Sequence, residues 1–113
     1  MAIELTKANF EQEVLACDKP VIIDFWATWG GPCRMQAPIL EQVEEELGEQ
    51  IRVCKVDVDS QVELAMQYGI ASIPTLVFMY KGMLQNRVVG LTPKTDIVEN
   101  IKNIIAAGGD LQI

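Results

Sequence analysis

Short apolar runs alternate along this chain with segments in which apolar residues recur every three or four positions. A continuous run rich in β-branched residues is typical of a strand buried on both faces, and the wider spacing is typical of a helix with one buried side. The predicted strands cover residues 3–5, 21–26, 51–58, 75–80 and 84–89. The predicted helices cover about 6–16, 33–47 and 62–68, and a last helix runs from about Pro93 to the pair Gly108–Gly109. This order predicts an α/β domain whose sheet is part parallel and part antiparallel, with helices on both faces.

Local signals support these helix boundaries. Thr6 is suited to cap the first helix, Gly48 to end the second, and Pro93 to begin the last. Pro38 lies inside the second helix, where it removes a hydrogen bond and should bend the axis. Each of the three longer helices is expected to bury one side. For the first helix these residues are Phe10, Val14 and Leu15. For the second they are Gln36, Ile39, Leu40, Val43 and Leu47, and for the last Ile97, Val98, Ile101, Ile104 and Ile105.

Length and composition narrow the class of protein. A chain of 113 residues fits one domain with one core. Its apolar runs are far shorter than the ~20 residues that span a bilayer, so no membrane segment is expected. The first residues lack the basic and apolar blocks of a secretory signal, which makes the cytoplasm the expected compartment.

Charge and residue usage exclude several functions. The formal net charge of −7 argues against nucleic-acid binding, which requires a basic surface. Much of the negative charge lies on glutamates of residues 41–49, which is typical of a solvated helix face. The chain has no histidine, so no imidazole can act as a base or a metal ligand.

Three cysteines, Cys17, Cys33 and Cys54, leave at least one thiol unpaired within a monomer. An odd and sparse count is unlike a secreted disulfide scaffold. Cys17 near a helix end and Cys54 within a strand are interpreted as small buried apolar residues. Cys33 follows a Trp-Gly-Gly-Pro turn at a predicted helix start, where the helix dipole and unpaired N–H groups favour the thiolate.

Asp24 lies inside the apolar run of the second strand. Burying an isolated carboxylate costs several kcal/mol unless the group is paired or protonated. Two interpretations remain open: an edge or bulge that lets the side chain reach water, or a buried carboxyl with a raised pKa that is poised for proton transfer. Lys55 on the neighbouring predicted strand is its natural partner.

Ile73-Pro74-Thr75 stands at the mouth of the next strand. Proline is unusual there because it withholds a ladder hydrogen bond. A cis peptide bond would leave the Ile73 backbone able to pair with an extended peptide, which would add a strand to the sheet.

These segments together resemble the thioredoxin family. The resemblance rests on residues 21–29 with Asp24 inside, Gly31-Pro32-Cys33, Pro38, Lys55-Val56-Asp57, Tyr68-Gly69-Ile70, Ile73-Pro74-Thr75, Gly82 and Gly90. It covers nearly the whole chain and implies a thioredoxin fold with about five strands and four helices. The domain is expected to occupy residues 1–107, followed by a short tail at 108–113.

The resemblance also implies the roles of individual residues. Pro74 should be cis and face the active-site loop, and Asp24 and Lys55 should lie beneath Cys33. A shallow apolar patch that docks an extended, cysteine-containing partner segment should be formed by Trp29, Gly31, Pro32, Ile73, Pro74 and Gly90. A thioredoxin reductase is a further candidate partner. No cofactor is implied, and a monomer is expected rather than a dimer.

The departure from the family falls at Gly30. The family loop reads Trp-Cys-Gly-Pro-Cys, and its first cysteine, the attacking nucleophile, is Gly30 here. Cys33 corresponds to the resolving cysteine, which normally releases the mixed disulfide. Dithiol–disulfide turnover is therefore expected to be lost or strongly reduced. Two consecutive glycines should also give a roomier and more mobile cleft.

Four interpretations of this departure stay open. In the first, Cys33 forms slow mixed disulfides with docked cysteine-containing segments, or the protein acts by docking. In the second, Gly30 disables or traps an otherwise ordinary disulfide reductase. In the third, Cys33 supplies one ligand of an iron–sulfur or metal site shared by a dimer, although clusters usually take four cysteines. In the fourth, the chain is a non-redox binding scaffold to which Cys33 contributes nothing.

Overall fold

A computed structural model describes residues 2–108 of the chain. Its strands are β1 (Ile3–Glu4), β2 (Val21–Trp26), β3 (Arg52–Asp57), β4 (Thr75–Tyr80) and β5 (Met83–Val89). Its helices are the π-helical turn η1 (Glu11–Leu15), α1 (Gly31–Leu47), the 3₁₀ turn η2 (Gly48–Gln50), α2 (Val62–Gln67) and α3 (Lys94–Ala106). The order of elements agrees with the predicted alternation.

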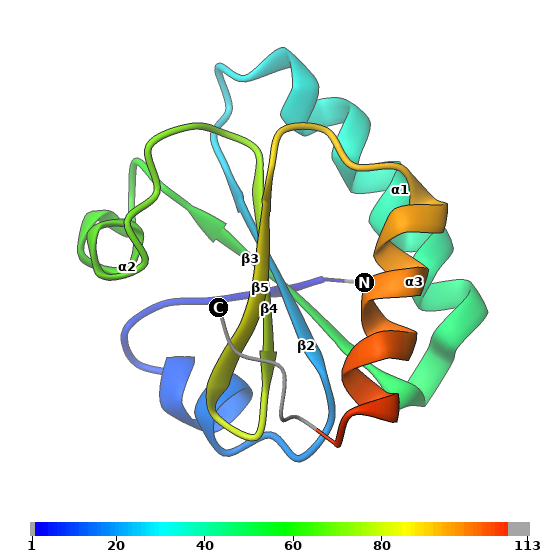
Figure 1. Ribbon diagram of the computed structural model, residues 1–113. Helices are drawn as coiled ribbons and strands as arrows, with labels where there is room; N and C mark the ends of the chain where they lie inside the picture. The colour runs from blue at the N-terminus through cyan, green and yellow to red at the C-terminus, as the bar shows by residue number, and fades with distance from the viewer. Residues whose placement is uncertain (1, 109–113) are drawn as a thin grey trace.

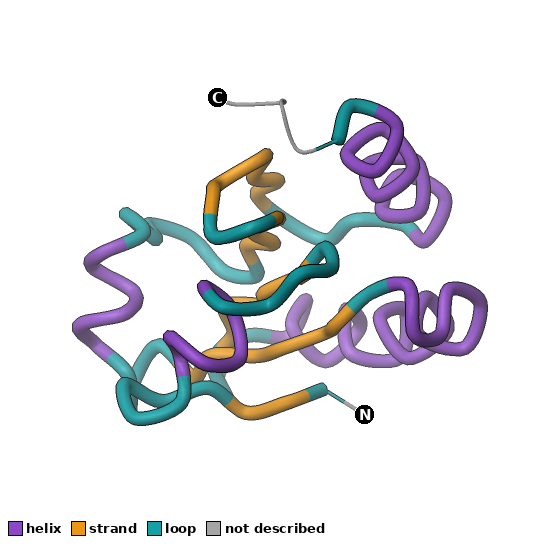
Figure 2. The backbone as a smooth tube through the Cα atoms, turned by 90° about the horizontal axis from the view of Figure 1, so that it is seen from below, coloured by secondary structure: helices purple, strands orange, loops and turns teal. Residues whose placement is uncertain are grey.

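The strands form one five-stranded sheet in the order β1-β3-β2-β4-β5. β1 and β2 both run parallel to β3, whereas β4 is antiparallel to β2 and to β5. Helices α1 and α3 cover one face, and η1 and α2 lie on the other (Figures 1 and 2). The predicted mixed sheet with helices on both faces, the thioredoxin fold, is confirmed.

Two apolar cores lie on opposite faces of the sheet. The first joins η1 and α2 to the sheet through residues such as Phe10, Val14 and Leu64. The second joins α1 and α3 to the sheet through residues that include Leu40 and Ile101. Side chains of β2 enter both cores, so this strand is buried on both sides as its unbroken apolar run predicts.

The first helix differs from the prediction of an α-helix over residues 6–16. Thr6 does not cap the observed helix, because the N-cap of η1 is Phe10, which makes no side-chain hydrogen bond. The Thr6 hydroxyl accepts the Ala8 N–H at 3.2 Å in the turn before the helix. Within the helix the Ala16 N–H donates to the Glu11 carbonyl five residues back. The regular α-helical pattern is therefore replaced by a wider π turn.

Two residues assigned to buried helix sides are exposed. Leu15 is 40% exposed and Ile105 is 43% exposed. Each follows a residue that takes the inward position, Val14 or Ile104, and one step along a helix rotates the side chain by about 100°. The other predicted inward residues of α1 and α3 are buried, apart from half-buried Ile39.

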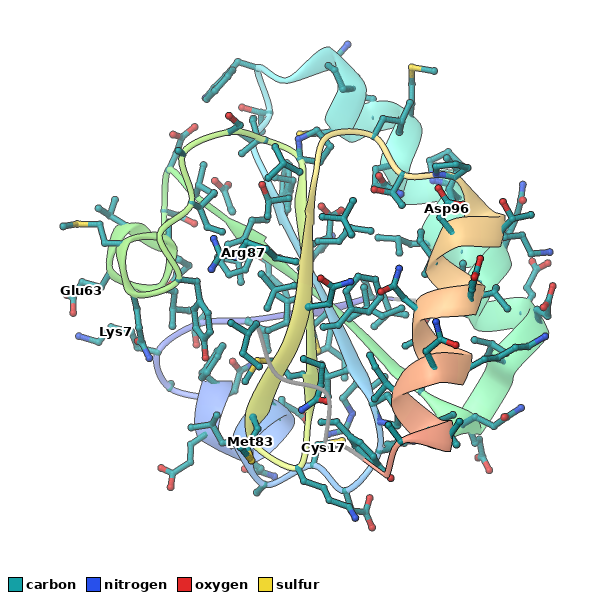
Figure 3. All side chains as sticks on the ribbon, in the orientation of Figure 1. Lys7, Cys17, Glu63, Met83, Arg87 and Asp96 are labelled. Atoms are coloured by element: carbon teal, nitrogen blue, oxygen red, sulfur yellow. The ribbon has the colours of Figure 1, made fainter. Side chains whose placement is uncertain are left out.

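Polar contacts attach α2 to the rest of the domain. Arg87 on β5 donates a hydrogen bond to the carbonyl of Tyr68, just after α2. Lys7 and Glu63 form an exposed ion pair at 2.8 Å, which contributes little stability (Figure 3). These contacts supplement the apolar packing of a helix of only six residues.

Helix α1 begins at Gly31, two residues earlier than expected, and Pro38 lies within it. Among residues 2–108, no helix combines the length and apolar character needed to cross a membrane. The expected boundary between the domain and a tail at 108–113 falls largely outside the described residues and stays a prediction.

Candidate functional site

Three loops meet at one end of the sheet, at the top of Figure 1: those before α1, before β4 and after β5. Strand β2 ends at Trp26, and Gly30 is the N-cap of α1. The backbone of Gly30 is extended, with φ −91° and ψ 108°, which other residues can also adopt. Its glycine is therefore not required by the backbone conformation.

The space beside Gly30 is occupied by its neighbours. A Cβ added to Gly30 would lie 2.8 Å from Ile73 Cδ1 and 2.9 Å from Cys33 Sγ. Both atoms are ends of side chains, so Ile73 and Cys33 leave no open space directly beside Gly30. A cleft that is roomier and more mobile than in a dithiol relative stays a prediction.

Cys33 is the third residue of α1 and is only 5% exposed. Burial raises the pKa of its thiol, a hydrogen bond with the Ala27 backbone lowers it, and the charge of Asp24 raises it further. The expectation that the helix start favours the thiolate of Cys33 is therefore not met, because burial, the largest effect on this thiol, raises its pKa.

Asp24 occupies the middle of β2, paired in register with Lys55 on β3. It is 5% exposed on a central strand, so the interpretation as an edge or bulge residue is wrong. Burial raises the pKa of Asp24 from 3.8 to about 7, and the positive charge of Lys55 offsets part of that rise. At neutral pH the carboxyl can therefore either accept or give up a proton.

Lys55 compensates the Asp24 charge only from a distance. Within residues 2–108 no ion pair at or below 4.0 Å joins the two groups, and Lys55 Nζ lies 5.7 Å from the centroid of the Trp26 ring. Asp24 Oδ1 and Trp26 Nε1 are buried polar atoms without a hydrogen-bond partner in this part of the chain. Unsatisfied buried groups of this kind are rare and often functional.

A pocket of about 360 Å³ brings these groups together with the thiol. Its lining consists of Asp24, Trp26, Ala27, Thr28, Cys33, Arg34, Ala37 and Lys55. Cys33 and Asp24 thus share one cavity, as the resemblance implies. A cavity of this volume has room for water between the thiol and the carboxyl, and such water would connect the two groups for proton transfer.

The opposite wall of the site is the loop before β4. The Ile73–Pro74 peptide bond is cis, and the Pro74 carbonyl accepts the Gly90 N–H at 2.8 Å. No hydrogen bond from residues 2–108 engages the Ile73 backbone. Its N–H and carbonyl are available to an extended ligand.

Exposed apolar side chains surround this wall. Trp29 is 68% exposed, and its Nε1 donates to Asp59 Oδ2 at 2.9 Å, which fixes the ring. Val89 is 62% exposed and Leu91 is 41% exposed, on either side of Gly90. Gly31 and Pro32 are exposed as well, whereas Gly30 and Pro74 are buried.

Sequence reasoning missed two contributors to the site. Asp59 orients Trp29, and nothing in its local pattern singles it out. Gln36 was assigned to the buried side of α1 without a role. The sequence did point to a role for Gln36, because an amide within an apolar stripe needs hydrogen-bond partners inside the protein.

The other two cysteines do not belong to this site. Cys17 and Cys54 are buried in the core beneath η1, and Figure 3 shows Cys17 at the end of the sheet opposite the three loops. All three cysteines are free thiols. Within the described residues no group of three or more His, Cys, Asp or Glu side chains is arranged to hold a metal ion.

The fold and the site define a class of small α/β protein that presents a thiol at a helix start, beside a cis-proline loop. The thioredoxin family profile matches residues 1–103. Thioredoxin 1 of Synechococcus elongatus is 44% identical over 101 residues, which span 89% of this chain and 94% of that protein. Thioredoxin of Rickettsia bellii is 42% identical over 105 residues, which span 93% of this chain and all of that protein.

A longer relative contains a matching segment. The bifunctional thioredoxin reductase/thioredoxin of Mycobacterium leprae is 40% identical over 105 residues, which span 93% of this chain and 23% of that protein. The chain belongs to the thioredoxin family. This membership supports a redox function of the thiol–disulfide type.

Proposed function

We propose that this protein is a monothiol member of its family that forms mixed disulfides through Cys33. It would dock extended, cysteine-containing protein segments against Trp29, Gly31, Pro32, Ile73, Pro74 and Gly90. The observation that carries the proposal is the pocket shared by Cys33 and Asp24, next to a residue 30 that has no thiol.

The chemical step begins with a disulfide of the docked partner. Asp24 accepts the proton of the Cys33 thiol, and the thiolate attacks one partner sulfur. A Cys33–partner disulfide forms, the partner disulfide breaks, and the departing sulfur leaves as a thiolate that is protonated from water. A carboxyl whose pKa is about 7 is matched to this proton transfer at neutral pH.

Release of the partner requires a second thiol, which this loop does not contain. Cys17 and Cys54 are buried in the other core and cannot replace it. An outside thiol must attack the mixed disulfide, regenerating the Cys33 thiol and leaving as a disulfide with the partner. The catalytic cycle therefore stops after its first step unless such a thiol is supplied.

The proposed partners are proteins with an accessible disulfide, and a thioredoxin reductase that recognises the same face. Three free thiols fit a reducing compartment such as the cytoplasm, and we propose that the protein acts there as a monomer.

Reduction of insulin, coupled to a thioredoxin reductase and NADPH, tests the proposal. We expect turnover at the level of the reaction without this protein, because the attacking thiol is missing. Brisk turnover would contradict the monothiol assignment. A two-cysteine thioredoxin run in parallel shows that the assay works.

A docking function that does not use the thiol is the second candidate. The exposure of Trp29, Val89 and Leu91 around the free Ile73 backbone favours it. Binding of a peptide without cysteine by Cys33→Ala, at wild-type affinity, would support docking alone. Loss of all binding when the peptide cysteine is removed would support the disulfide mechanism.

A further inference from the structure

Gln36 is a completely buried amide on the helix that carries Cys33. It lies three residues after Cys33, at 0% exposure, in a stripe whose next members are Leu40 and Val43. A buried amide has two donor hydrogens and an acceptor oxygen that must find partners inside the protein. Its partners identify what the residue does.

Both ends of the Gln36 amide bind one backbone residue. The Thr92 N–H donates to Gln36 Oε1 at 2.8 Å, and Gln36 Nε2 donates to the Thr92 carbonyl at 3.1 Å. Thr92 is itself only 2% exposed. The side chain therefore pairs with this backbone much as a neighbouring strand would.

Thr92 ends the loop after β5, which carries Gly90 and Leu91 and forms one wall of the candidate site. At its other end, Gly90 donates its N–H to the Pro74 carbonyl at 2.8 Å, and the Thr92 hydroxyl donates to the Gly90 carbonyl at 3.1 Å. Pro93 follows as the N-cap of α3. The segment 90–92 is thus held between the Pro74 loop and the helix that carries Cys33.

An apolar residue at position 36 could fill the space but could not make this connection. It would leave the N–H and carbonyl of Thr92 buried without these partners, and unsatisfied buried polar groups destabilise a fold. Displacing the loop toward water would relieve that destabilisation, and the displacement would move Gly90 and Leu91 relative to Cys33.

We propose that Gln36 is a positioning residue that sets the distance between the Gly90–Leu91 wall and the Cys33 thiol. A peptide docked at Ile73 and Gly90 would then hold its sulfur at the distance from Cys33 that the reaction needs. This inference rests on the proposed function for its effect on partners. Its structural part, the placement of the wall, can be measured separately.

The test compares Gln36→Met with the matched control Gln85→Met. Gln85 is also buried, at 2% exposure, but it lies near the start of β5, where its Nε2 donates to the Met83 carbonyl at 3.3 Å and its Oε1 has no partner in the described chain. Both substitutions keep a similar volume and remove a buried amide. Only Gln36→Met removes the hydrogen bonds with Thr92.

The first readout is the rate of mixed-disulfide formation at Cys33 with a disulfide-bearing peptide and with a small aromatic disulfide. Gln36→Met should slow the peptide reaction by about 10-fold or more while the small disulfide reacts at nearly the wild-type rate, since misplacement affects positioned reactants most. Gln85→Met should leave both rates unchanged. Equal slowing of both reactions, or no slowing, by Gln36→Met would overturn the proposal.

The second readout is amide hydrogen exchange at Thr92 and the NMR signals of Gly90 and Cys33. Gln36→Met should accelerate exchange at Thr92 and shift both signals, and Gln85→Met should do neither. Unchanged exchange and signals in Gln36→Met would overturn the inference even if wild-type protein failed to react with any peptide. That failure by itself would count against the proposed function.

If Gln36→Met does not fold, Gln36→Asn takes its place in both measurements. The shorter amide keeps the polar character of the side chain, but its reach is one methylene less, so it is not expected to hold the N–H and the carbonyl of Thr92 at the same time. We expect smaller changes in the same directions. A wild-type profile for this variant would overturn the proposal.

Discussion

Cys33 and Cys54 have almost the same exposure, 5% and 0%, yet they lie in regions of different chemical character. Cys54 is enclosed by the apolar core beneath η1, and burial raises its pKa to about 12. Cys33 lines a pocket of about 360 Å³ together with Asp24 and Lys55. Exposure therefore does not distinguish the two thiols, whereas the cavity shared with Asp24 does. If the proposed function holds, this cavity is what makes Cys33 the reactive thiol.

The largest expected effect comes from giving Cys33 a partner thiol. Gly30→Cys should raise insulin reduction with a thioredoxin reductase by at least about 100-fold, because a neighbouring thiol acts at high effective concentration. The extended backbone at residue 30 accepts a cysteine, provided that Ile73 Cδ1 and Cys33 Sγ move aside.

The same assay separates two explanations of the natural loop. High turnover by Gly30→Cys means that the surrounding site is redox-competent and lacks only the attacking thiol. An inert Gly30→Cys protein that forms the expected disulfide would show that more than one group is missing. Gly30→Ser controls for the added side chain and should stay inactive.

Removing the Cys33 thiol and the Cys54 thiol in turn tests whether only the first of them reacts. Cys33→Ala should abolish the mixed disulfide with a peptide, and Cys54→Ala should retain it. Cys54→Ala should instead lower the free energy of unfolding by about 1 kcal/mol, because it leaves a small cavity in the core. Intact-mass spectrometry and urea unfolding make the two measurements. An adduct that persists in Cys33→Ala would place the reactive thiol elsewhere.

Asp24 should link the stability of the protein to pH. Its folded pKa of about 7 is above the unfolded value of 3.8, so folding favours the protonated carboxyl. The destabilisation is absent below about pH 4, grows as the pH rises, and is complete above about pH 7. Asp24→Asn should therefore raise the free energy of unfolding by about 4 kcal/mol at pH 8, and this gain should disappear toward pH 4.

Urea unfolding of wild type and Asp24→Asn across this pH range measures the difference. A gain that does not change with pH would mean that the Asp24 carboxyl is not shifted by burial. The same variant should slow mixed-disulfide formation at pH 7, because the thiol loses its proton acceptor.

The smallest expected effect concerns Lys55. Its positive charge lowers the pKa of Asp24 without a close ion pair, so Lys55→Met should raise that pKa further above about 7. NMR titration of the Asp24 carboxyl carbon measures the shift. A lowered pKa in Lys55→Met would contradict the assigned role, and Lys7→Met, on the surface beside Glu63, is the control.

Most of the fold could be predicted because periodicity and turn residues agree along the chain. The unbroken apolar run of β2 and the glycine that ends α1 each specify their element locally. The π turn at η1 could not be predicted, since it arises from how Phe10, Val14 and Cys17 fit one core. Leu15 was misplaced for the same reason.

The residues of the candidate site could be named from sequence, but their electrostatics could not. The expected placement of Lys55 on the strand next to Asp24 follows from strand order, and the structure puts the two residues in register. The pKa of the Cys33 thiol depends on its burial, on the hydrogen bond with the Ala27 backbone and on the charge of Asp24, and these opposing effects can be compared only with coordinates. The pairing of Gln36 with Thr92 joins residues 56 positions apart, beyond the reach of local patterns.

The most direct test of the central claim is a time course of covalent trapping. Reduced wild-type protein is mixed with a disulfide-bearing peptide, quenched with acid at intervals, and measured by intact mass and peptide mapping. We predict one adduct, on Cys33, that accumulates and persists until an outside thiol is added. An adduct that releases itself as reduced peptide, or the absence of any adduct on Cys33, would contradict the account.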